Sequence, residues 1–372
     1  MPDTATRILV FVRVISGGAG RNAVKYANIL AAAGHAVTLA CARAPQAEAF
    51  GLDREAVELR VIPARHTMQA IRPLRRLIRE TEPDICLVVD MRNMAAMRLA
   101  LAPLARQPRV ILRDVLFTWD RVAGKPWPVR LYKQRVHEKG YRRADRVIAL
   151  NGAMARQVAE RWPVPPERIA VIPNGVALPD PAPKPAPAPG APPVILCVAR
   201  LTDQKNIPLL LRAFAELRGQ RPARLRLAGD GPRRGRLEAA ARELGIAEDV
   251  AFLGTVSDVG AEYRRAALTV LPSRYEGFPN VVIESLAHGT PVVATATPGA
   301  VEILEGSGCG LIARQDDAAD LARQMAAALD AGFDPAALRA LAERYSEARL
   351  AERLLALVSE EAARAPARGG GG

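Results

Sequence analysis

Short runs of apolar and β-branched residues alternate along this chain with longer amphipathic segments, and this alternation constrains the fold more than any other feature. The short runs predict strands over residues 7–13, 36–40, 59–62, 84–89, 109–112, 146–150, 169–172, 193–198, 224–228, 250–252, 268–271 and 291–294. The longer segments predict helices over residues 22–33, 67–80, 93–105, 153–161, 207–218, 232–244, 261–266 and 280–287. Strands separated by helices pair in parallel, with helices on both faces of the sheet. The pattern therefore predicts an α/β fold.

A proline-rich segment divides this pattern in two. Residues 179–193 contain eight prolines, which favour an extended polyproline conformation and cannot complete a strand ladder. A chain of 372 residues also exceeds what one hydrophobic core usually organises. We therefore expect two Rossmann-like doubly wound domains, residues 1–178 and 191–345, which face a cleft and are joined by the linker 179–193. Residues 365–372 are expected to form a disordered tail.

Composition and charge limit the compartment and the partners. The four cysteines have no C-x-x-C spacing and no apolar run is long enough to span a membrane, so a cytoplasmic protein without disulfides or a zinc ribbon is expected. The formal net charge of residues 1–190 is +14, whereas that of residues 191–372 is −1. Positive charge on one domain indicates an acidic partner there, namely anionic lipid, nucleic acid or a phosphorylated acceptor. An arginine-rich solvated surface is the alternative.

A glycine-rich segment, residues 16–20, follows the first predicted strand. Glycines there let backbone amides approach a phosphate at the start of a helix, where the helix dipole favours negative charge. The spacing of Gly17, Gly18 and Gly20 does not match the dinucleotide fingerprint G-x-G-x-x-G, and no acidic residue ends the next strand. An NAD site is therefore not expected, and a tight turn is the alternative to a phosphate site.

Two segments of the second half also follow predicted strands, where open α/β sheets bind ligands. Arg200 and Lys205 are suited to hold the two phosphates of a pyrophosphate, although two basic residues on a loop are often only solvated. The segment 273–284 places Glu276 before a predicted helix start and Glu284 about one turn into the helix. Free amides at that start suit an anion, and neighbouring carboxylates suit the hydroxyl groups of a sugar or ribose. A surface pair of glutamates on an ordinary helix is the alternative.

These segments together resemble the retaining glycosyltransferases of family 4, the group 1 family, which have the GT-B fold. The resemblance is carried by Arg200 and Lys205, Gly229-Asp-Gly231, residues 276–284, Gly289-Thr-Pro-Val-Val-Ala294, Gly17-Gly18, Gly34-His35 and Pro173-Asn-Gly-Val176. It covers nearly the whole chain apart from the linker and the tail. It also implies that the final predicted helix, residues 346–363, crosses back to pack on the first domain. That domain would then comprise residues 1–178 and about 346–364.

The resemblance implies a hexosyltransferase with an acceptor-side first domain and a second domain that binds a nucleotide-diphosphate sugar, with UDP as the first candidate and GDP as the next. The sugar would keep its anomeric configuration, and neither a cofactor nor a metal would be required, since the chain has no Asp-x-Asp motif. Arg200 and Lys205 would stabilise the leaving diphosphate. Glu276 would bind the transferred sugar, and Glu284 the ribose hydroxyls. The full donor-binding set implied is Gly17, Gly18, Arg200, Lys205, Gly229, Glu276, Gly277, Phe278, Pro279, Asn280, Val281 and Glu284.

One position departs from the family pattern. The family often has a histidine at the end of the strand that corresponds to residues 109–112, whereas this chain has Arg113-Asp114 there, and none of its four histidines takes that place. Asp114 is therefore a candidate catalytic residue beside Glu276, Arg200 and Lys205. It can accept a hydrogen bond from the donor sugar or orient an acceptor hydroxyl. A plain ion pair with Arg113 is the alternative.

Residues 121–146 form a basic segment with aromatic residues between the charges. Trp127, Tyr132 and Tyr141 are interleaved, and Trp119 lies just upstream. The basic residues are Arg121, Lys125, Arg130, Lys133, Arg135, Lys139, Arg142, Arg143 and Arg146. Such segments lie on anionic membrane surfaces, so we predict peripheral association with the inner face of the plasma membrane. Solvated helix faces with the aromatic residues in the core are the alternative.

The expected function is transfer of a sugar from a nucleotide sugar to a lipid-linked saccharide or a cell-surface polysaccharide precursor. A GT-B sugar-nucleotide epimerase or phosphorylase is the alternative within the fold. A basic nucleic-acid-binding protein is the alternative of another class, suggested by the isoelectric point of about 10.2. No helix-turn-helix, RNP or zinc-finger signature supports it, so no nucleic-acid partner is expected.

Overall fold

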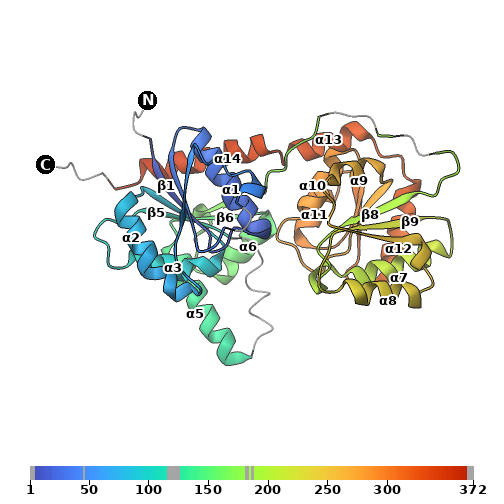
Figure 1. The fold of residues 1–372 in the computed structure, drawn as a ribbon, viewed down its shortest axis with the longest axis horizontal. Helices are drawn as coiled ribbons and strands as arrows, with labels where there is room; N and C mark the ends of the chain where they lie inside the picture. Colours follow the sequence, from blue (N-terminus) through green and yellow to red (C-terminus); the bar gives the residue numbers. More distant parts are fainter. Residues whose placement is uncertain (1–4, 45–46, 115–125, 181–183, 186–187, 367–372) are drawn as a thin grey trace. The chain divides into compact units, whose positions relative to one another are not determined.

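The computed structural model describes residues 5–44, 47–114, 126–180, 184–185 and 188–366. It divides into two compact units, each with its own parallel sheet and covering helices (Figure 1). Unit 1 comprises Met1–Asn174 and Leu350–Gly372, and unit 2 comprises Gly175–Arg349. The predicted α/β class with two Rossmann-like units is confirmed. Of the predicted tail, residues 367–372 lie outside the described residues.

Unit 1 is built on a seven-stranded sheet with the order β3-β2-β1-β4-β5-β6-β7, and all of its pairings are parallel. The strands are β1 (Arg7–Phe11), β2 (Ala36–Cys41), β3 (Val57–Val61), β4 (Ile85–Val89), β5 (Arg109–Arg113), β6 (Arg146–Ala149) and β7 (Ile169–Val171). The helices are α1 (Gly17–Ala32), α2 (Ile71–Thr81), α3 (Met91–Leu101), α5 (Trp127–Arg143), α6 (Gly152–Arg161) and α14 (Glu347–Ala363). Short 3-10 turns lie at Glu48–Phe50, Thr67–Ala70 and Pro166–Arg168.

Unit 2 is built on a six-stranded parallel sheet with the order β10-β9-β8-β11-β12-β13. The strands are β8 (Val194–Val198), β9 (Arg224–Ala228), β10 (Val250–Gly254), β11 (Leu268–Leu271), β12 (Val292–Thr295) and β13 (Gly310–Ala313). The helices are α7 (Ile207–Arg218), α8 (Arg234–Glu243), α9 (Val259–Arg265), α10 (Asn280–Ala287), α11 (Pro298–Leu304), α12 (Ala318–Asp330) and α13 (Pro335–Glu343). Short 3-10 turns lie at Asp203–Lys205 and Ala247–Asp249.

Both sheets reverse their strand order beside the first strand of the unit. β1 lies between β2 and β4, and β8 lies between β9 and β11. In a doubly wound sheet the loops at this reversal diverge to opposite faces, and ligands bind there at the carboxyl ends of the strands. The loops after β1 and β4, and those after β8 and β11, are therefore the first places to look for a site.

Most of the predicted elements are present, and α7, β9, β11 and α10 have the predicted bounds. The predicted start of α1 was wrong: the helix begins at Gly17, so the glycine-rich segment forms its first turn instead of a separate turn. The prediction also omitted α5, α11, β13, α12 and α13. β13 and α11 have only 4 and 7 residues, which is too short for a clear apolar period. In α12 the apolar face is largely alanine, so it contrasts weakly with the polar face.

The last helix, α14, packs in the core of unit 1. Its apolar side chains recur at helical spacing and are buried in the same cluster as residues of β1, β2 and β4; they are Leu350, Leu354, Leu357 and Val358. The fully buried carboxylate of Glu361 forms ion pairs with Arg109 at 2.6 Å and with Arg146 at 3.5 Å. Because these two arginines begin β5 and β6, the pairs hold α14 at the amino-terminal edge of the sheet.

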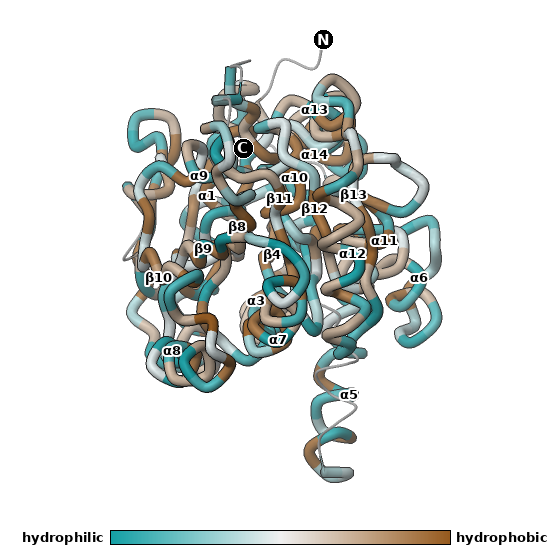
Figure 2. Tube along the Cα trace, turned by 90° about the vertical axis from the view of Figure 1, so that its right-hand side faces the viewer, coloured by the Kyte–Doolittle hydropathy of each residue, from teal (hydrophilic) through white to brown (hydrophobic). Residues whose placement is uncertain are grey.

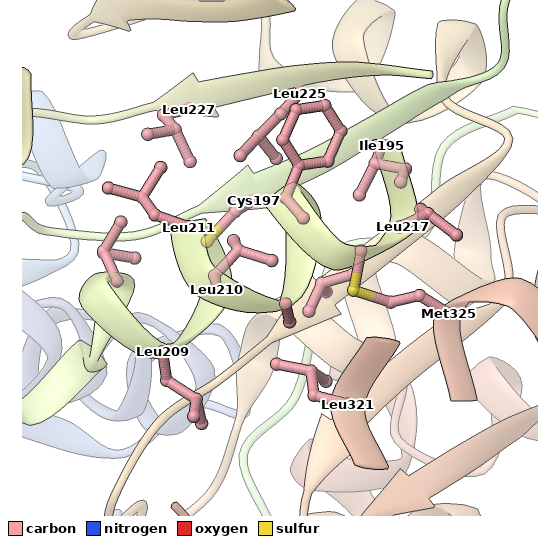
Figure 3. Packing of buried hydrophobic residues seen from close by; sticks show 14 of the residues in the cluster. Ile195, Cys197, Leu209, Leu210, Leu211, Leu217, Leu225, Leu227, Leu321 and Met325 are labelled. Atoms are coloured by element: carbon pink, nitrogen blue, oxygen red, sulfur yellow. The ribbon is translucent and has the colours of Figure 1, made fainter. Parts of the chain in front are cut away.

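Helix α7 forms the centre of the unit 2 core. Figure 3 shows its leucine side chains between residues of β8 and β9 on one side and residues of α12 on the other, which explains why α7 is apolar on most of its surface. The labelled residues are Ile195, Cys197, Leu209, Leu210, Leu211, Leu217, Leu225, Leu227, Leu321 and Met325. Each fully buried leucine contributes about 1.5–3 kcal/mol. This packing gives the loop between β8 and α7 a rigid base.

The described part of the proline-rich segment lies within unit 2. The Lys184 ammonium donates hydrogen bonds to the Ala266 carbonyl at 2.7 Å, the Thr290 hydroxyl at 2.7 Å and the Gly289 carbonyl at 3.3 Å. The Pro179 carbonyl accepts a hydrogen bond from Arg339 at 2.9 Å. The segment is therefore anchored to unit 2 by two basic side chains.

Lys184 makes stability depend on pH. Burial lowers the pKa of Lys184 to about 8, whereas a lysine in the unfolded chain has a pKa of about 10.4. Between these values the unfolded chain binds one more proton than the folded protein, so this group makes the free energy of unfolding rise as the pH rises. We expect the difference in Tm, wild type minus Lys184→Met, to increase between pH 8 and pH 10. Between pH 6 and pH 7 this difference should stay constant. A constant offset across the whole range would contradict the prediction.

Candidate active site

Two residues predicted for the site meet in unit 2, although they are 71 positions apart in the chain. The Lys205 Nζ lies 2.5 Å from Glu276 Oε1. The same carboxylate oxygen accepts a hydrogen bond from the fully buried Ser273 hydroxyl at 2.7 Å. Lys205 ends the 3-10 turn after β8, and Glu276 lies in the loop between β11 and α10. The reversal of strand order thus brings a cation and a carboxylate together, and their use by a donor stays a prediction.

Further hydrogen bonds join the same two loops. The Gln204 side chain donates to the Tyr275 carbonyl at 3.0 Å, and the Arg274 amide donates to the Gln204 carbonyl at 2.9 Å. The buried Asn206 amide donates to Asp316, just after β13, at 3.0 Å. Sequence reasoning missed Ser273, Gln204 and Asn206 because their roles depend on partners in distant loops. They fix the positions of Lys205 and Glu276.

Arg200 lies five residues before Lys205 and is exposed. Its loop is placed by a close approach of two backbones. At Gly229, which has φ +133°, a Cβ would lie 2.1 Å from the Ala199 carbonyl oxygen, and at Gly231 a Cβ would lie 2.5 Å from the Leu201 carbonyl oxygen. Only glycine fits at these positions. Gly229, predicted to bind the donor, thus positions the loop that carries Arg200.

Glu284 lies one turn into α10 and is held by a residue that the sequence did not single out. The Tyr263 hydroxyl donates to Glu284 Oε2 at 2.9 Å, and the tyrosine ring stacks on His288 with ring centroids 5.3 Å apart. Burial, together with the charge of Glu284, raises the pKa of Tyr263 well above its usual value. The hydroxyl therefore stays protonated and donates to the carboxylate. One oxygen of Glu284 is thus fixed.

The segment from Gly277 to Val281 leads into α10, with Pro279 at the helix N-cap position. One amide of this turn is already engaged, since Asn280 donates to the Phe278 carbonyl at 3.2 Å, and Pro279 has no amide hydrogen. The predicted anion cradle therefore has fewer free donors than expected. The Phe278 side chain is buried and lies against Tyr345, with ring centroids 5.5 Å apart, so it supports the turn from beneath.

In unit 1 the first turn of α1 carries Gly17 and Gly18 after β1. A Cβ on either glycine would meet no atom within 4 Å, so nothing described crowds this helix start. Gly17 has φ +58°, a conformation that favours glycine. Gly20 is the tightly packed member of the segment, because a Cβ there would lie 2.7 Å from the Ile15 carbonyl carbon. The helix start thus has open space beside Gly17 and Gly18, and the binding of a donor there stays a prediction.

Asp114 lies just beyond β5 and is buried, with 2% of its surface exposed. The Tyr141 hydroxyl donates to Asp114 Oδ2 at 2.5 Å. The guanidinium of Arg113 instead donates to the Tyr26 hydroxyl at 3.1 Å and to Asn174 Oδ1 at 2.5 Å. The alternative of an Arg113–Asp114 ion pair was therefore wrong. A role of Asp114 toward substrate hydroxyls stays a prediction.

The basic segment divides into an exposed half and a structural half. Residues 126–132 are all exposed, with Trp127 and Tyr132 each 71% exposed. The first half of α5 extends away from the rest of unit 1 and mixes apolar with polar residues (Figures 1 and 2). Tyr141, in contrast, is buried, and Arg143 is bound to Asp145 and Gln107. Trp119, Arg121 and Lys125 lie outside the described residues. Within the described ranges no helix is long and apolar enough to cross a bilayer.

Comparison with known protein families matches both halves of the chain. Residues 16–178 match the model "Glycosyltransferase Family 4", and residues 180–362 match the model "Glycosyl transferases group 1". D-inositol 3-phosphate glycosyltransferase of Thermobispora bispora is 35% identical over 222 residues, which are 55% of this chain and 52% of that protein. The putative colanic acid biosynthesis glycosyltransferase WcaL of Escherichia coli K12 is 31% identical over 200 residues, 51% of this chain and 49% of that protein. The chain thus matches about half the length of these curated relatives.

Solved structures share the fold over nearly the whole chain. The apo lipopolysaccharide outer core galactosyltransferase WaaB has a TM-score of 0.76 at 18% identity, over 95% of this chain and 100% of that one. HepE of Anabaena, solved in complex with UDP-glucose, has a TM-score of 0.78 at 18% identity, over 95% of this chain and 99% of that one. These likenesses establish the GT-B fold. Because the two family models together match nearly the entire chain, the protein belongs to the group 1 glycosyltransferases.

Proposed function

We propose that this protein transfers a hexose from a nucleotide-diphosphate sugar to a saccharide acceptor, with retention of the anomeric configuration and without a metal ion. The observation that carries the proposal is the Lys205–Glu276 pair at the strand reversal of unit 2, with exposed Arg200 on the same loop. A cation paired with a carboxylate, and a second cation on the same loop, suit a ligand that combines a diphosphate with hydroxyl groups. A nucleotide sugar has both.

These residues would act mainly by electrostatic stabilisation. When the bond between the anomeric carbon and the diphosphate oxygen breaks, negative charge develops on the leaving phosphate. Arg200 and Lys205 would stabilise that charge, which lowers the barrier to transfer. Glu276, fixed by Ser273 and Lys205, would accept hydrogen bonds from the sugar, and Glu284, fixed by Tyr263, would accept them from the ribose. The acceptor hydroxyl oxygen would then bond to the anomeric carbon, and its proton would pass to the departing diphosphate.

UDP is the nucleotide we propose first and GDP second. Support for UDP comes from HepE of Anabaena, which was solved with UDP-glucose bound. A thermal-shift panel of UDP-, GDP- and ADP-sugars tests the choice, since a ligand that binds only the folded state raises the Tm by mass action. One nucleotide series should raise the Tm. A protein stabilised only by sugar plus inorganic phosphate would instead be a phosphorylase, and sugar conversion without an acceptor would identify an epimerase.

We further propose that the acceptor is a lipid-linked saccharide or polysaccharide precursor, met by unit 1 at the cytoplasmic face of the plasma membrane. The exposed half of α5 supports this proposal. It presents the exposed apolar side chains Trp127, Val129, Leu131 and Tyr132 with exposed Arg130, and half-buried Lys133 and exposed Arg135 follow directly. Aromatic and basic side chains on one exposed helix suit an anionic interface, and each cation near it contributes about 1 kcal/mol.

Liposome sedimentation tests the membrane proposal. Wild-type protein should bind vesicles that contain anionic lipid, and binding should fall with added salt. The double variant Lys133→Ser/Arg135→Ser should bind several-fold more weakly. The matched control Arg236→Ser/Arg242→Ser changes the charge equally on exposed positions of α8 in unit 2 and should bind like the wild type. Equal recovery with neutral and anionic vesicles would contradict the proposal and indicate a soluble acceptor.

A further inference from the structure

Arg113, the last residue of β5, is the largest fully buried side chain of the described residues, with 1% of its surface exposed. Its partners are neutral: Nε donates to the Tyr26 hydroxyl at 3.1 Å, and one terminal nitrogen, Nη2, donates to Asn174 Oδ1 at 2.5 Å. The guanidinium also lies over the Tyr26 ring, 5.3 Å from its centroid. The other terminal nitrogen, Nη1, is buried and has no hydrogen-bond partner among the described residues.

The arginine at the opposite end of the same strand has carboxylate partners. Arg109 begins β5 and pairs with Asp145 at 3.0 Å and with Glu361 at 2.6 Å, although it is less buried than Arg113. No carboxylate of the described residues lies within 4 Å of the Arg113 guanidinium. Two acidic residues beside Arg113 along the backbone have other partners: Asp90, whose amide donates to the Arg113 carbonyl, pairs with Arg92, and Asp114 accepts a hydrogen bond from Tyr141. Among the residues that the structure describes, Arg113 is thus a buried cation with no carboxylate paired to it.

A buried guanidinium with an unmade hydrogen bond is costly unless a ligand completes it. Arg113 lies at the carboxyl ends of the strands, where open α/β sheets bind ligands, whereas Arg109 lies at the other edge. Arg113 also joins three elements of this edge, because Tyr26 belongs to α1 and Asn174 follows β7. Its position and its missing partner therefore both indicate a ligand.

We propose that Arg113 binds an oxyanion of the saccharide substrate, a carboxylate or a phosphate. The oxyanion replaces the neutral Asn174 amide at Nη2 and also accepts from Nη1, which forms the two-pronged pair that guanidinium and oxyanion groups favour. Asn174 retains 6% exposure, so it is the partner that a ligand can displace. Only the identification of this oxyanion as part of a substrate rests on the proposed function. The anion site itself belongs to unit 1 and is measured without turnover.

The test is calorimetric titration of D-glucuronate, which supplies a carboxylate, and of glycerol 3-phosphate, which supplies a phosphate, with D-glucose as the neutral control. Saturating UDP is present throughout, so that it occupies the proposed nucleotide site and the probes do not bind to the cations of unit 2. We expect the wild type to bind one anionic probe and not glucose, and the probe that binds identifies the source of the oxyanion. Arg113→Gln should weaken that binding about tenfold or more.

Asn174→Asp keeps the test decisive if Arg113→Gln does not fold. It places a carboxylate on Arg113 from within the chain, so it should raise the Tm and abolish probe binding. Asn151→Asp is the matched control, because it makes the same change at an amide that caps α6 at the same sheet edge through the Met154 amide, and it should bind like the wild type. The proposal is overturned if neither anion binds the wild type, if Asn174→Asp binds as the wild type does, or if Asn174→Asp lowers the Tm. Anion binding without sugar transfer would leave this site standing and refute only the proposed function.

Discussion

Lys205→Ala should lower kcat/KM for the nucleotide sugar about 100- to 1000-fold, since it removes a cation that stabilises charge developing on the leaving group. The substitution also leaves the buried Glu276 carboxylate without its ion-pair partner, so the Tm should fall. Steady-state kinetics with the donor identified by thermal shift, together with the Tm, measure both effects.

The double variant Lys205→Ala/Glu276→Ala separates catalysis from stability. Removing both charges should restore much of the Tm but none of the activity, because neither the diphosphate nor the sugar then has its partner. Arg233→Ala serves as a control: it breaks an exposed ion pair with Asp203, which begins the same 3-10 turn, and should change neither quantity appreciably. If Lys205→Ala keeps the wild-type kcat/KM for the nucleotide sugar, Lys205 does not act in the site.

Gly229→Ala should be the most destabilising single substitution near the site. Its Cβ would lie 2.1 Å from the Ala199 carbonyl oxygen at a backbone φ of +133°, so both steric overlap and backbone strain oppose it. Together these should cost roughly 3–5 kcal/mol in the free energy of unfolding. Urea denaturation measures this loss, and surviving protein should also bind the donor more weakly, since the Arg200 loop must move.

Gly235→Ala is the matched control for that substitution. Gly235 lies in α8, where a Cβ would meet no atom within 4 Å, so alanine should stabilise the helix by about 0.5–1 kcal/mol. If Gly229→Ala unfolds at the same urea concentration as Gly235→Ala, the close approach of the two loops does not hold.

Much of the fold could be predicted because the residue pattern within a single segment is enough to identify many of the helices and strands. Helix α7 was predicted with correct bounds. Pro208 is suited to the first turn of a helix, and the leucines of the segment extend to Leu217, next to the last helical residue Arg218. β13 could not be predicted in the same way, because Gly310 to Ala313 is a strand only through its pairing with β12. Helix α5 was missed because its outer half contacts nothing described that would impose an apolar period.

The candidate site was predictable where the residue type itself indicates the chemistry. Arg200, Lys205, Glu276 and Glu284 are charged residues on loops after strands, so position and charge sufficed. Tyr263 could not be found, because only its contact with a carboxylate 21 positions away distinguishes it from a core tyrosine. The same holds for Arg113: its sequence position suggests an ion pair with the next residue, whereas the alternation of side chains along β5 directs it to Tyr26 and Asn174 instead.

We propose that the strand reversal of unit 2 binds a nucleoside diphosphate through Arg200 and Lys205 without a metal ion. Isothermal titration of UDP, GDP and ADP in the presence of EDTA tests it most directly, with the wild type compared to Arg200→Ala/Lys205→Ala. We expect at least one diphosphate, UDP first, to bind the wild type in EDTA, and we expect the double variant to bind it at least a hundredfold more weakly. Binding that is absent from the wild type, that requires a divalent cation, or that persists in the double variant would contradict it.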